Sequence, residues 1–207
     1  MSVRYAVTGI GTDVGKTVVS AILAEALRAS YWKPVQAGDL DNSDSIKIGN
    51  LTSNVRVLPE GFKLSQPMSP HAAAEIDGVE IQLSDLALPN VDGALIAEGA
   101  GGLMVPINSR GLTYADVFQS WDIPVIVVSR HYLGSINHTL LTIEVLKQRN
   151  IKIEGIVFVG DENQATESII LETTKLKMIM RVPMAKELNK EFIAEQAKQP
   201  QIQYNFI

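Results

Sequence analysis

The stretch GIGTDVGKT, at residues 9–17, constrains this chain more than any other part of its sequence. It ends in Gly-Lys-Thr like a phosphate-binding loop, but five residues separate Gly9 from Gly15 where the usual G-x-x-x-x-G-K-[ST] pattern has four. Residues 3–8, VRYAVT, have the composition of a buried strand, and residues 16–29 carry apolar side chains at helical spacing. A glycine-rich turn between such elements points backbone N–H groups and a helix N-terminus at an anion. The stretch therefore predicts a phosphate loop of unusual length.

Within this loop, Gly11 is predicted to absorb the extra residue, because glycine adopts backbone angles that other residues avoid. Lys16 is then placed for the β- and γ-phosphates of a nucleotide, and Thr17 for Mg²⁺. A glycine-rich turn without a ligand is the alternative interpretation. The loop residues expected to contact the nucleotide are Gly11, Thr12, Asp13, Val14, Gly15, Lys16 and Thr17.

Further apolar runs alternate with segments of helical periodicity such as residues 136–149. The runs are GALIAE (93–98), IPVIVVS (123–129), IEGIVFV (153–159) and a shorter YWKPV (31–35). This alternation predicts an α/β fold with a mainly parallel sheet and helices on both faces, arranged as one P-loop NTPase-like domain over residues 1–207. Short helices are also expected near residues 71–75 and in the polar tail after Glu187.

Composition narrows the classes of partner. The formal net charge is −5, and no basic run suggests binding to nucleic acid or to an anionic membrane surface. There is no cysteine, which excludes disulfides and thiolate chemistry and fits a reducing compartment. No apolar stretch approaches the roughly 20 residues that span a bilayer, and no leader-like segment precedes the first strand. A cytoplasmic location is expected.

In open parallel sheets, ligands bind at the carboxyl ends of the strands, so the residues after each run are candidates for the site. Lys33 lies at the edge of an otherwise apolar strand, where its charge needs a partner, and Asp44 follows a turn rich in Asp, Asn and Ser. One interpretation places Lys33 beside the phosphates and Asp44 beside the metal. The other makes Asp41, Asn42 and Ser43 a helix cap and Asp44 a partner of the helix dipole.

Glu98 follows four apolar residues and precedes glycines, in the segment EGAGG at residues 98–102. A carboxylate at a strand end costs desolvation energy unless it is paired or bound to metal, and Mg²⁺ prefers oxygen ligands. We therefore expect Glu98 to bind Mg²⁺, with an ordinary glycine-rich turn as the alternative. The glycines that follow let backbone approach a ligand closely, and Val105 resumes a rigid path before Pro106.

Gly134, Ser135 and Asn137 begin the helix after the run at 123–129, where free N–H groups bind an anion or are capped by the side chains themselves. The three histidines, His71, His131 and His138, are interpreted as packed or surface residues. No serine, histidine and aspartate arrangement for acyl transfer is evident.

Taken together, GIGTDVGKT, KPVQAGD, NSD, SPHAA, EGAGG and LGSINHTLLT, in this order and spacing, resemble the dethiobiotin synthetase family from the first strand to about Gly160. The lengthened phosphate loop is a feature of that family. The resemblance implies a reaction of ATP, CO₂ and 7,8-diaminopelargonate that gives dethiobiotin, ADP and phosphate in biotin biosynthesis, through a carbamate and a carbamic-phosphoric mixed anhydride.

The resemblance also assigns roles to residues. Lys16 and Lys33 would flank the transferring phosphoryl group and the carbamate, Thr12 would contact substrate or phosphate, and Thr17, Asp44 and Glu98 would gather Mg²⁺. It implies a homodimer in which the substrate carboxylate binds at the helix near Gly134 of the opposite subunit. The substrate-binding residues expected on this basis are Lys33, Ala37, Gly101, Gly102, Val105, Gly134, Ser135 and Asn137.

Two positions depart from the family pattern. Ala37 stands where a hydroxylated residue is common, and Val159 stands where an asparagine commonly reads the adenine. Because valine cannot hydrogen-bond a base edge, weaker base discrimination is predicted. Backbone groups around Gly160 or around Pro183 would then have to contact the base.

The competing interpretation is a dimeric ATPase switch of related fold that controls partner binding and makes no small molecule. Such switches often carry a further lysine near the start of the phosphate loop, and residues 7–14 contain none. A non-catalytic binding module is a third interpretation, which two lysines and two candidate metal carboxylates at converging strand ends disfavour.

Overall fold

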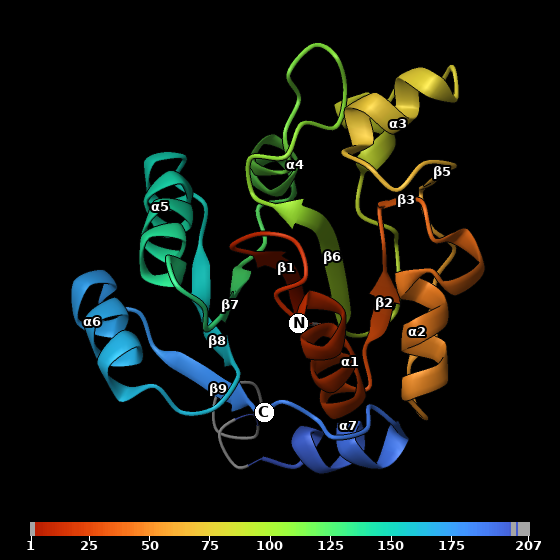
Figure 1. The fold of residues 1–207 in the computed structure, drawn as a ribbon. Helices are drawn as coiled ribbons and strands as arrows, with labels where there is room; N and C mark the ends of the chain where they lie inside the picture. Colours follow the sequence, from red (N-terminus) through yellow and green to blue (C-terminus); the bar gives the residue numbers. More distant parts are fainter. Residues whose placement is uncertain (1–2, 200–201, 203–207) are drawn as a thin grey trace.

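The fold is built on a seven-stranded parallel sheet (Figure 1). The computed structural model describes residues 3–199 and 202. Across the sheet the strands run in the order β4 (Arg56–Val57), β2 (Ser30–Trp32), β6 (Leu95–Gly102), β1 (Arg4–Gly9), β7 (Val125–Arg130), β8 (Ile153–Val159) and β9 (Met178–Val182). The predicted fold class is confirmed.

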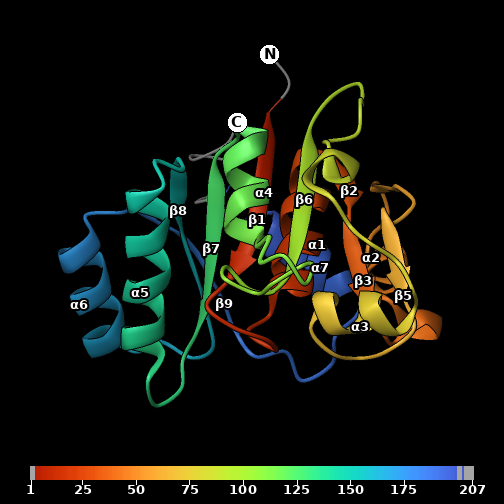
Figure 2. The same ribbon diagram turned by 90° about the horizontal axis from the view of Figure 1, so that it is seen from above.

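Helices cover both faces of this sheet (Figure 2). On one face, α1 (Lys16–Leu27), α2 (Asp44–Leu51) and α7 (Lys190–Ala197) contact one another. On the other lie α4 (Tyr114–Trp121), α5 (Ser135–Gln148) and α6 (Gln164–Thr174). The helix α7 confirms the helix expected after Glu187, while residues 200–201 and 203–207 of that tail lie outside the described residues.

A small second sheet lies beside the main one. Its strands β3 (Val35–Ala37) and β5 (Phe62–Leu64) are parallel, and α3 (Pro70–Ile76) packs against both, which confirms the short helix expected near residues 71–75. Two 3₁₀ helices, η1 (Leu40–Asn42) and η2 (Leu83–Leu86), complete the assigned elements. The prediction of one strand over 31–35 was wrong: β2 ends at Trp32, and Pro34, which has no N–H group for the sheet ladder, separates it from β3.

The central strands are buried on both sides, which explains their continuous apolar runs. Val7, Ala97, Val127 and Val157, one from each of four adjacent strands, are fully inaccessible to solvent. The predicted boundary at Glu98 was wrong, because β6 continues through the glycines to Gly102 and pairs with the end of β1. Glu98 is therefore held within a strand at the centre of the sheet.

None of the described helices is both long and apolar enough to cross a membrane.

Candidate active site

The phosphate loop joins the end of β1 to the start of α1, as predicted. Gly15 caps α1 with φ +94°, a conformation that favours glycine, and its carbonyl accepts the Val19 N–H at 3.0 Å. The Lys16 side chain turns back over the loop and donates from Nζ to the Gly11 carbonyl at 2.8 Å. The loop is thus shaped around a lysine ammonium at the N-terminus of a helix.

The expected role of Gly11 in the loop backbone was wrong. The left-handed conformation that accommodates the longer loop belongs to Asp13, at φ +55°, and not to Gly11. Aspartate tolerates this region better than most residues because its short side chain hydrogen-bonds locally. The Asp13 carbonyl also accepts a 3.1 Å hydrogen bond from Arg130 Nη1 at the end of β7.

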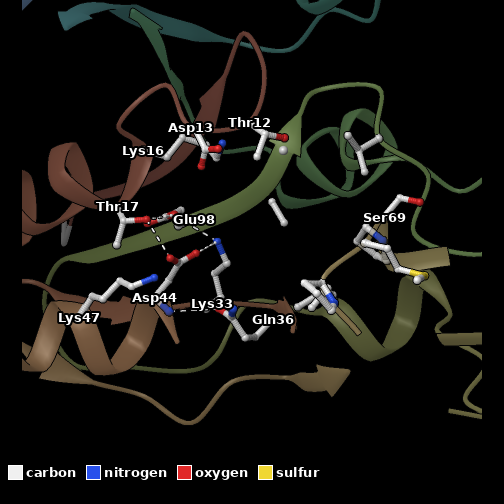
Figure 3. Close-up of a pocket in the computed structure, with 18 of the residues that line it drawn as sticks. Thr12, Asp13, Lys16, Thr17, Lys33, Gln36, Asp44, Lys47, Ser69 and Glu98 are labelled. Atoms are coloured by element: carbon white, nitrogen blue, oxygen red, sulfur yellow. Dashed lines mark hydrogen bonds and ion pairs between the residues drawn. The ribbon is translucent and has the colours of Figure 1, made fainter. Parts of the chain in front are cut away.

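A cluster of charged side chains lies next to the loop (Figure 3). Lys33 Nζ lies 2.5 Å from Asp44 Oδ2 and 3.1 Å from Glu98 Oε1, and it also donates to the Gly99 carbonyl at 3.0 Å. Thr17 Oγ1 lies 3.1 Å from Asp44 Oδ1 and 3.0 Å from Glu98 Oε1. Three oxygen-bearing side chains from α1, α2 and β6 therefore converge on one point.

Burial and charge together set the ionisation of these groups. Lys33 is 2% exposed; burial by itself lowers the pKa of an ammonium, but Glu98 and Asp44 outweigh burial and raise the pKa of Lys33 above its ordinary value. For Asp44, burial raises the carboxyl pKa, and Lys33 more than reverses this, so the net pKa is lowered. Lys33 and Asp44 are thus both charged at neutral pH.

Lys16 behaves differently. Its pKa is lowered to about 8, first by burial and next by repulsion from Lys33, with Glu98 and Asp44 opposing the shift. An incoming phosphate would replace water around this ammonium with a full negative charge and so favour the protonated form.

The capping interpretation of the segment before α2 is confirmed for Ser43 only, because Asp41 and Asn42 lie in η1. Ser43 caps the helix by accepting the Ile46 N–H at 3.3 Å, and Asp44 is the first helical residue. The same cap fixes the backbone from which Asp44 reaches Thr17 and Lys33. The capping interpretation and the placement beside the cluster are therefore compatible.

A cavity of 670 Å³ opens beside the cluster. It brings together many of the residues singled out in the sequence: Thr12, Asp13, Gly15, Lys16, Thr17, Lys33, Ala37, Asp44, Glu98, Gly101 and Val105. Sequence reasoning missed four others that lie at or beside it, namely Tyr31, Gln36, Lys47 and Ser69. Gln36 and Ser69 stand inside the quoted motifs KPVQAGD and SPHAA, so those motifs carried a usable signal.

A second cavity, of 220 Å³, adjoins the loop on its other side and shares Asp13, Gly15 and Val18 with the first. Val159 and Pro183 line it, as expected for the base end of a nucleotide, together with Arg130 and the apolar residues Val182, Met184, Leu188 and Phe192. Gly160 follows Val159 and packs beside the His131 ring. Val14, a residue of the loop, is buried and lines neither of these two cavities.

A third cavity, of 490 Å³, lies between the loop, the end of β6 and α5, and it is lined by Gly11, Thr12, Gly102, Val105 and His138 among others. Gly134 caps α5, with Ser135 and Asn137 in its first turn, so these residues stand at a helix N-terminus as predicted. None of the three lines the cavities described above, and the structure does not bring them to the cluster within one chain.

The donor set fits Mg²⁺. Thr17, Asp44 and Glu98 offer hard oxygen atoms within about one coordination shell of each other, and Mg²⁺ in nucleotide sites commonly takes one or two carboxylates and completes its shell with phosphates and water. Among the described residues, no group of three or more His, Cys, Asp or Glu side chains is placed to hold a metal without such help.

Comparison with known proteins places the chain in a family. Residues 4–192 match a family model described as an AAA domain. An ATP-dependent dethiobiotin synthetase from Christiangramia forsetii is 55% identical over 88% of this chain and 88% of its own length. A synthetase of the same name from Rhodopseudomonas palustris strain BisB18 is 49% identical over 92% and 91% of the two chains, respectively. This chain belongs to the dethiobiotin synthetase family.

Solved structures confirm the fold of this synthetase family member. The septum site-determining protein MinD of Pyrococcus horikoshii, complexed with Mg-ADP, superposes with a TM-score of 0.64 over 99% of this chain and 98% of its own. A putative plasmid partition protein of Borrelia burgdorferi bound to AMPPNP gives 0.60 over 100% and 98%. Both are below 15% identical, so the likeness concerns the fold alone.

Proposed function

We propose that this protein is an ATP-dependent dethiobiotin synthetase that converts 7,8-diaminopelargonate, CO₂ and ATP into dethiobiotin, ADP and phosphate. The observation that carries the proposal is the convergence of Lys16, Lys33, Thr17, Asp44 and Glu98 on one cavity beside the phosphate loop. Relatives that are 45–55% identical bear this activity in their names.

The chemistry proceeds in three steps. An uncharged amine of the substrate attacks CO₂ and loses a proton, which forms a carbamate. A carbamate oxygen then attacks the γ-phosphorus of ATP, and ADP leaves, which gives the carbamic-phosphoric mixed anhydride. Finally, the second amine attacks the carbamoyl carbon, phosphate leaves, and the attacking nitrogen loses a proton, which closes the ureido ring.

Lys16 and Lys33 suit this reaction because phosphoryl transfer asks a protein mainly for positioning and for neutralisation of charge. Their positive charges also favour an uncharged substrate amine, the form that attacks CO₂. The carbamate is already anionic, so no dedicated protein base is required. Lys33 is held rigidly by two carboxylates and a carbonyl, whereas Lys16 bonds the loop carbonyl that phosphates would displace.

Thr17, Asp44 and Glu98 would hold Mg²⁺, which when bound neutralises phosphate charge. Thr12 and the loop residues from Gly11 to Val14 would surround the phosphates. The base would lie in the second cavity against Val159, Gly160 and Pro183. Support for this placement comes from the residues that the two cavities share at the loop.

The substrate would occupy the 670 Å³ cavity beside Lys33, Ala37, Gly101 and Val105, and Gly102 lines the third cavity. We further propose a cytoplasmic homodimer of one-domain subunits, in which Gly134, Ser135 and Asn137 of the opposite subunit bind the substrate carboxylate. The exposed side chains of Met104, Leu133 and Leu141 around α5 and the third cavity support an interface on this side.

The test is a product assay on the purified protein with Mg-ATP and bicarbonate, with and without 7,8-diaminopelargonate. We expect diamine-dependent ADP release matched one for one by dethiobiotin, identified by mass. ADP release that ignores the diamine and yields no dethiobiotin would refute the proposal and favour an ATPase switch. Sedimentation of the same sample tests the dimer. The product assay on the Asn137→Ala variant tests whether Asn137 binds the substrate carboxylate.

A further inference from the structure

The Glu98 carboxylate has a partner that the phosphate chemistry does not require. Tyr31, on β2, donates from its hydroxyl to Glu98 Oε2 at 3.0 Å, while Glu98 Oε1 accepts from Thr17 and Lys33. We propose that Tyr31 is a positioning residue for the Mg²⁺ site: its hydroxyl fixes the orientation of Glu98 so that Oε1 faces Thr17 and Asp44. This inference rests on the proposed function, since the metal serves the bound nucleotide.

The sheet places this tyrosine. In the parallel pairing of β2 with β6, Tyr31 lies opposite Ile96, and alternate residues of a strand share a face. Glu98, two residues beyond Ile96 in β6, therefore lies on the same face of the sheet as Tyr31, and Lys33 follows directly after β2. Tyr31 donates to Oε2 of the Glu98 carboxylate, and Lys33 donates to Oε1.

The hydrogen bond between Tyr31 and Glu98 matters because both residues are buried. Tyr31 and Glu98 are both completely inaccessible to solvent. Within the described part of the chain, the Tyr31 hydroxyl is the one hydrogen-bond donor found for Glu98 Oε2. Without it, this oxygen would be a buried charged acceptor with no donor, an arrangement that proteins avoid. The carboxylate would relieve this by rotating toward Lys33, which would carry Oε1 away from Thr17.

The test compares Tyr31→Phe with the wild-type protein by titrating Mn²⁺ into the ADP complex and following free Mn²⁺ by EPR, without turnover. Phenylalanine keeps the ring and removes only the donor. We expect Mn²⁺ affinity to fall about tenfold, the effect of roughly one hydrogen bond to a charged group, while affinity for metal-free ADP changes less than about twofold. In turnover, the apparent constant for Mg²⁺ rises similarly, and saturating Mg²⁺ largely restores kcat.

The matched control is Thr174→Val, which removes another buried hydroxyl at nearly constant volume. Thr174 lies in α6 and donates to the Ile170 carbonyl at 2.8 Å, on the opposite side of the sheet from α1 and α2. We expect this variant to lose stability without any change in Mn²⁺ affinity.

Three results would overturn the role of Tyr31: unchanged or tighter Mn²⁺ binding in Tyr31→Phe, an equal loss of metal-free ADP binding, or a wild-type protein that binds no Mn²⁺ with ADP. The Mn²⁺ titration needs no diamine. A protein that binds Mn²⁺ with ADP but makes no dethiobiotin would refute the proposed activity, while the effect of Tyr31→Phe on Mn²⁺ would still decide the positioning role.

Discussion

Replacing Lys33 with methionine should cost the ligand-free protein about 3 kcal/mol of stability at pH 7. The substitution nearly preserves side-chain length and removes the charge that Asp44 and Glu98 face. Loss of one partner from a buried ion pair costs about 3–5 kcal/mol. We take the lower end because the Asp44 side chain is 22% exposed and can be hydrated, whereas Glu98 cannot. In urea, this corresponds to a midpoint shift of about 1 M.

The pH dependence of this loss has a definite sign. Asp44 has a lowered folded-state pKa, so its pairing with Lys33 contributes stability above the unfolded pKa of about 3.9 and loses it as the pH falls through the folded value. Lys33 has a raised pKa, so its contribution is complete below about 10.4 and is lost as the pH rises through the folded value. The stability gap between wild type and Lys33→Met should therefore be full from about pH 5 to 10 and smaller at pH 3.

The assay is urea unfolding followed by circular dichroism at pH 7 and pH 3, with Lys47→Met as the matched control. Lys47 lines the same cavity and pairs with Asp39 at 2.9 Å, but it is 36% exposed, so its loss should cost less than about 1 kcal/mol. Added Mg²⁺ should stabilise Lys33→Met more than wild type, since a cation returns to the two carboxylates. A loss below about 1 kcal/mol at pH 7, or a gap that widens in acid, would refute the reasoning.

Three further predictions concern the nucleotide. The pKa of Lys16 is lowered to about 8 and its protonated form attracts phosphate, so the affinity for metal-free ADP should fall between pH 7 and 9. Lys16→Met should make this affinity nearly independent of pH. Calorimetry that finds the same pH dependence in Lys16→Met and in the wild type would contradict the prediction. ATP, GTP and CTP should support similar kcat/KM, and Val159→Asn should raise the preference for ATP about tenfold; a wild-type enzyme that strongly favours ATP would contradict this. Gly15→Ala should destabilise the protein by about 1–2 kcal/mol, because Gly15 has φ +94° and an added Cβ would lie 3.3 Å from the Val159 side chain. The rise in melting temperature on adding ADP should also be smaller than in the wild type. An unchanged melting temperature would argue against this prediction.

The features that could be predicted from the sequence are those that depend on residues close together in the chain. Loop 9–17 lies between elements whose periodicities are unmistakable, and α2 carries its cap directly before Asp44, so strand, helix and cap could be predicted from neighbours in the chain. The central strands were predictable because strands buried on both faces must be apolar throughout.

The remaining features depend on pairing between distant segments. The glycines of EGAGG favour a turn locally, but pairing of β6 with the end of β1 keeps them in the sheet. The strand β9 was not predicted, since Arg181 interrupts its apolar run and is neutralised by Glu167 of α6. Tyr31 escaped notice because its partner, Glu98, is far away in the sequence, and only the register of two strands joins them.

Residues that line the second cavity are synthesised at different times, so the protein should become able to bind a whole nucleotide only late in synthesis. The cavity lining includes residues between 13 and 18 and residues between 182 and 192, and the last of these, Phe192, lies in α7, the helix that packs on α1. Residues 13–18 are synthesised well before residues 182–192, and domains fold as their segments emerge from the ribosome. The phosphate loop can thus form early around β1 and α1, but a nascent chain should gain firm hold of a whole nucleotide only after α7 leaves the exit tunnel.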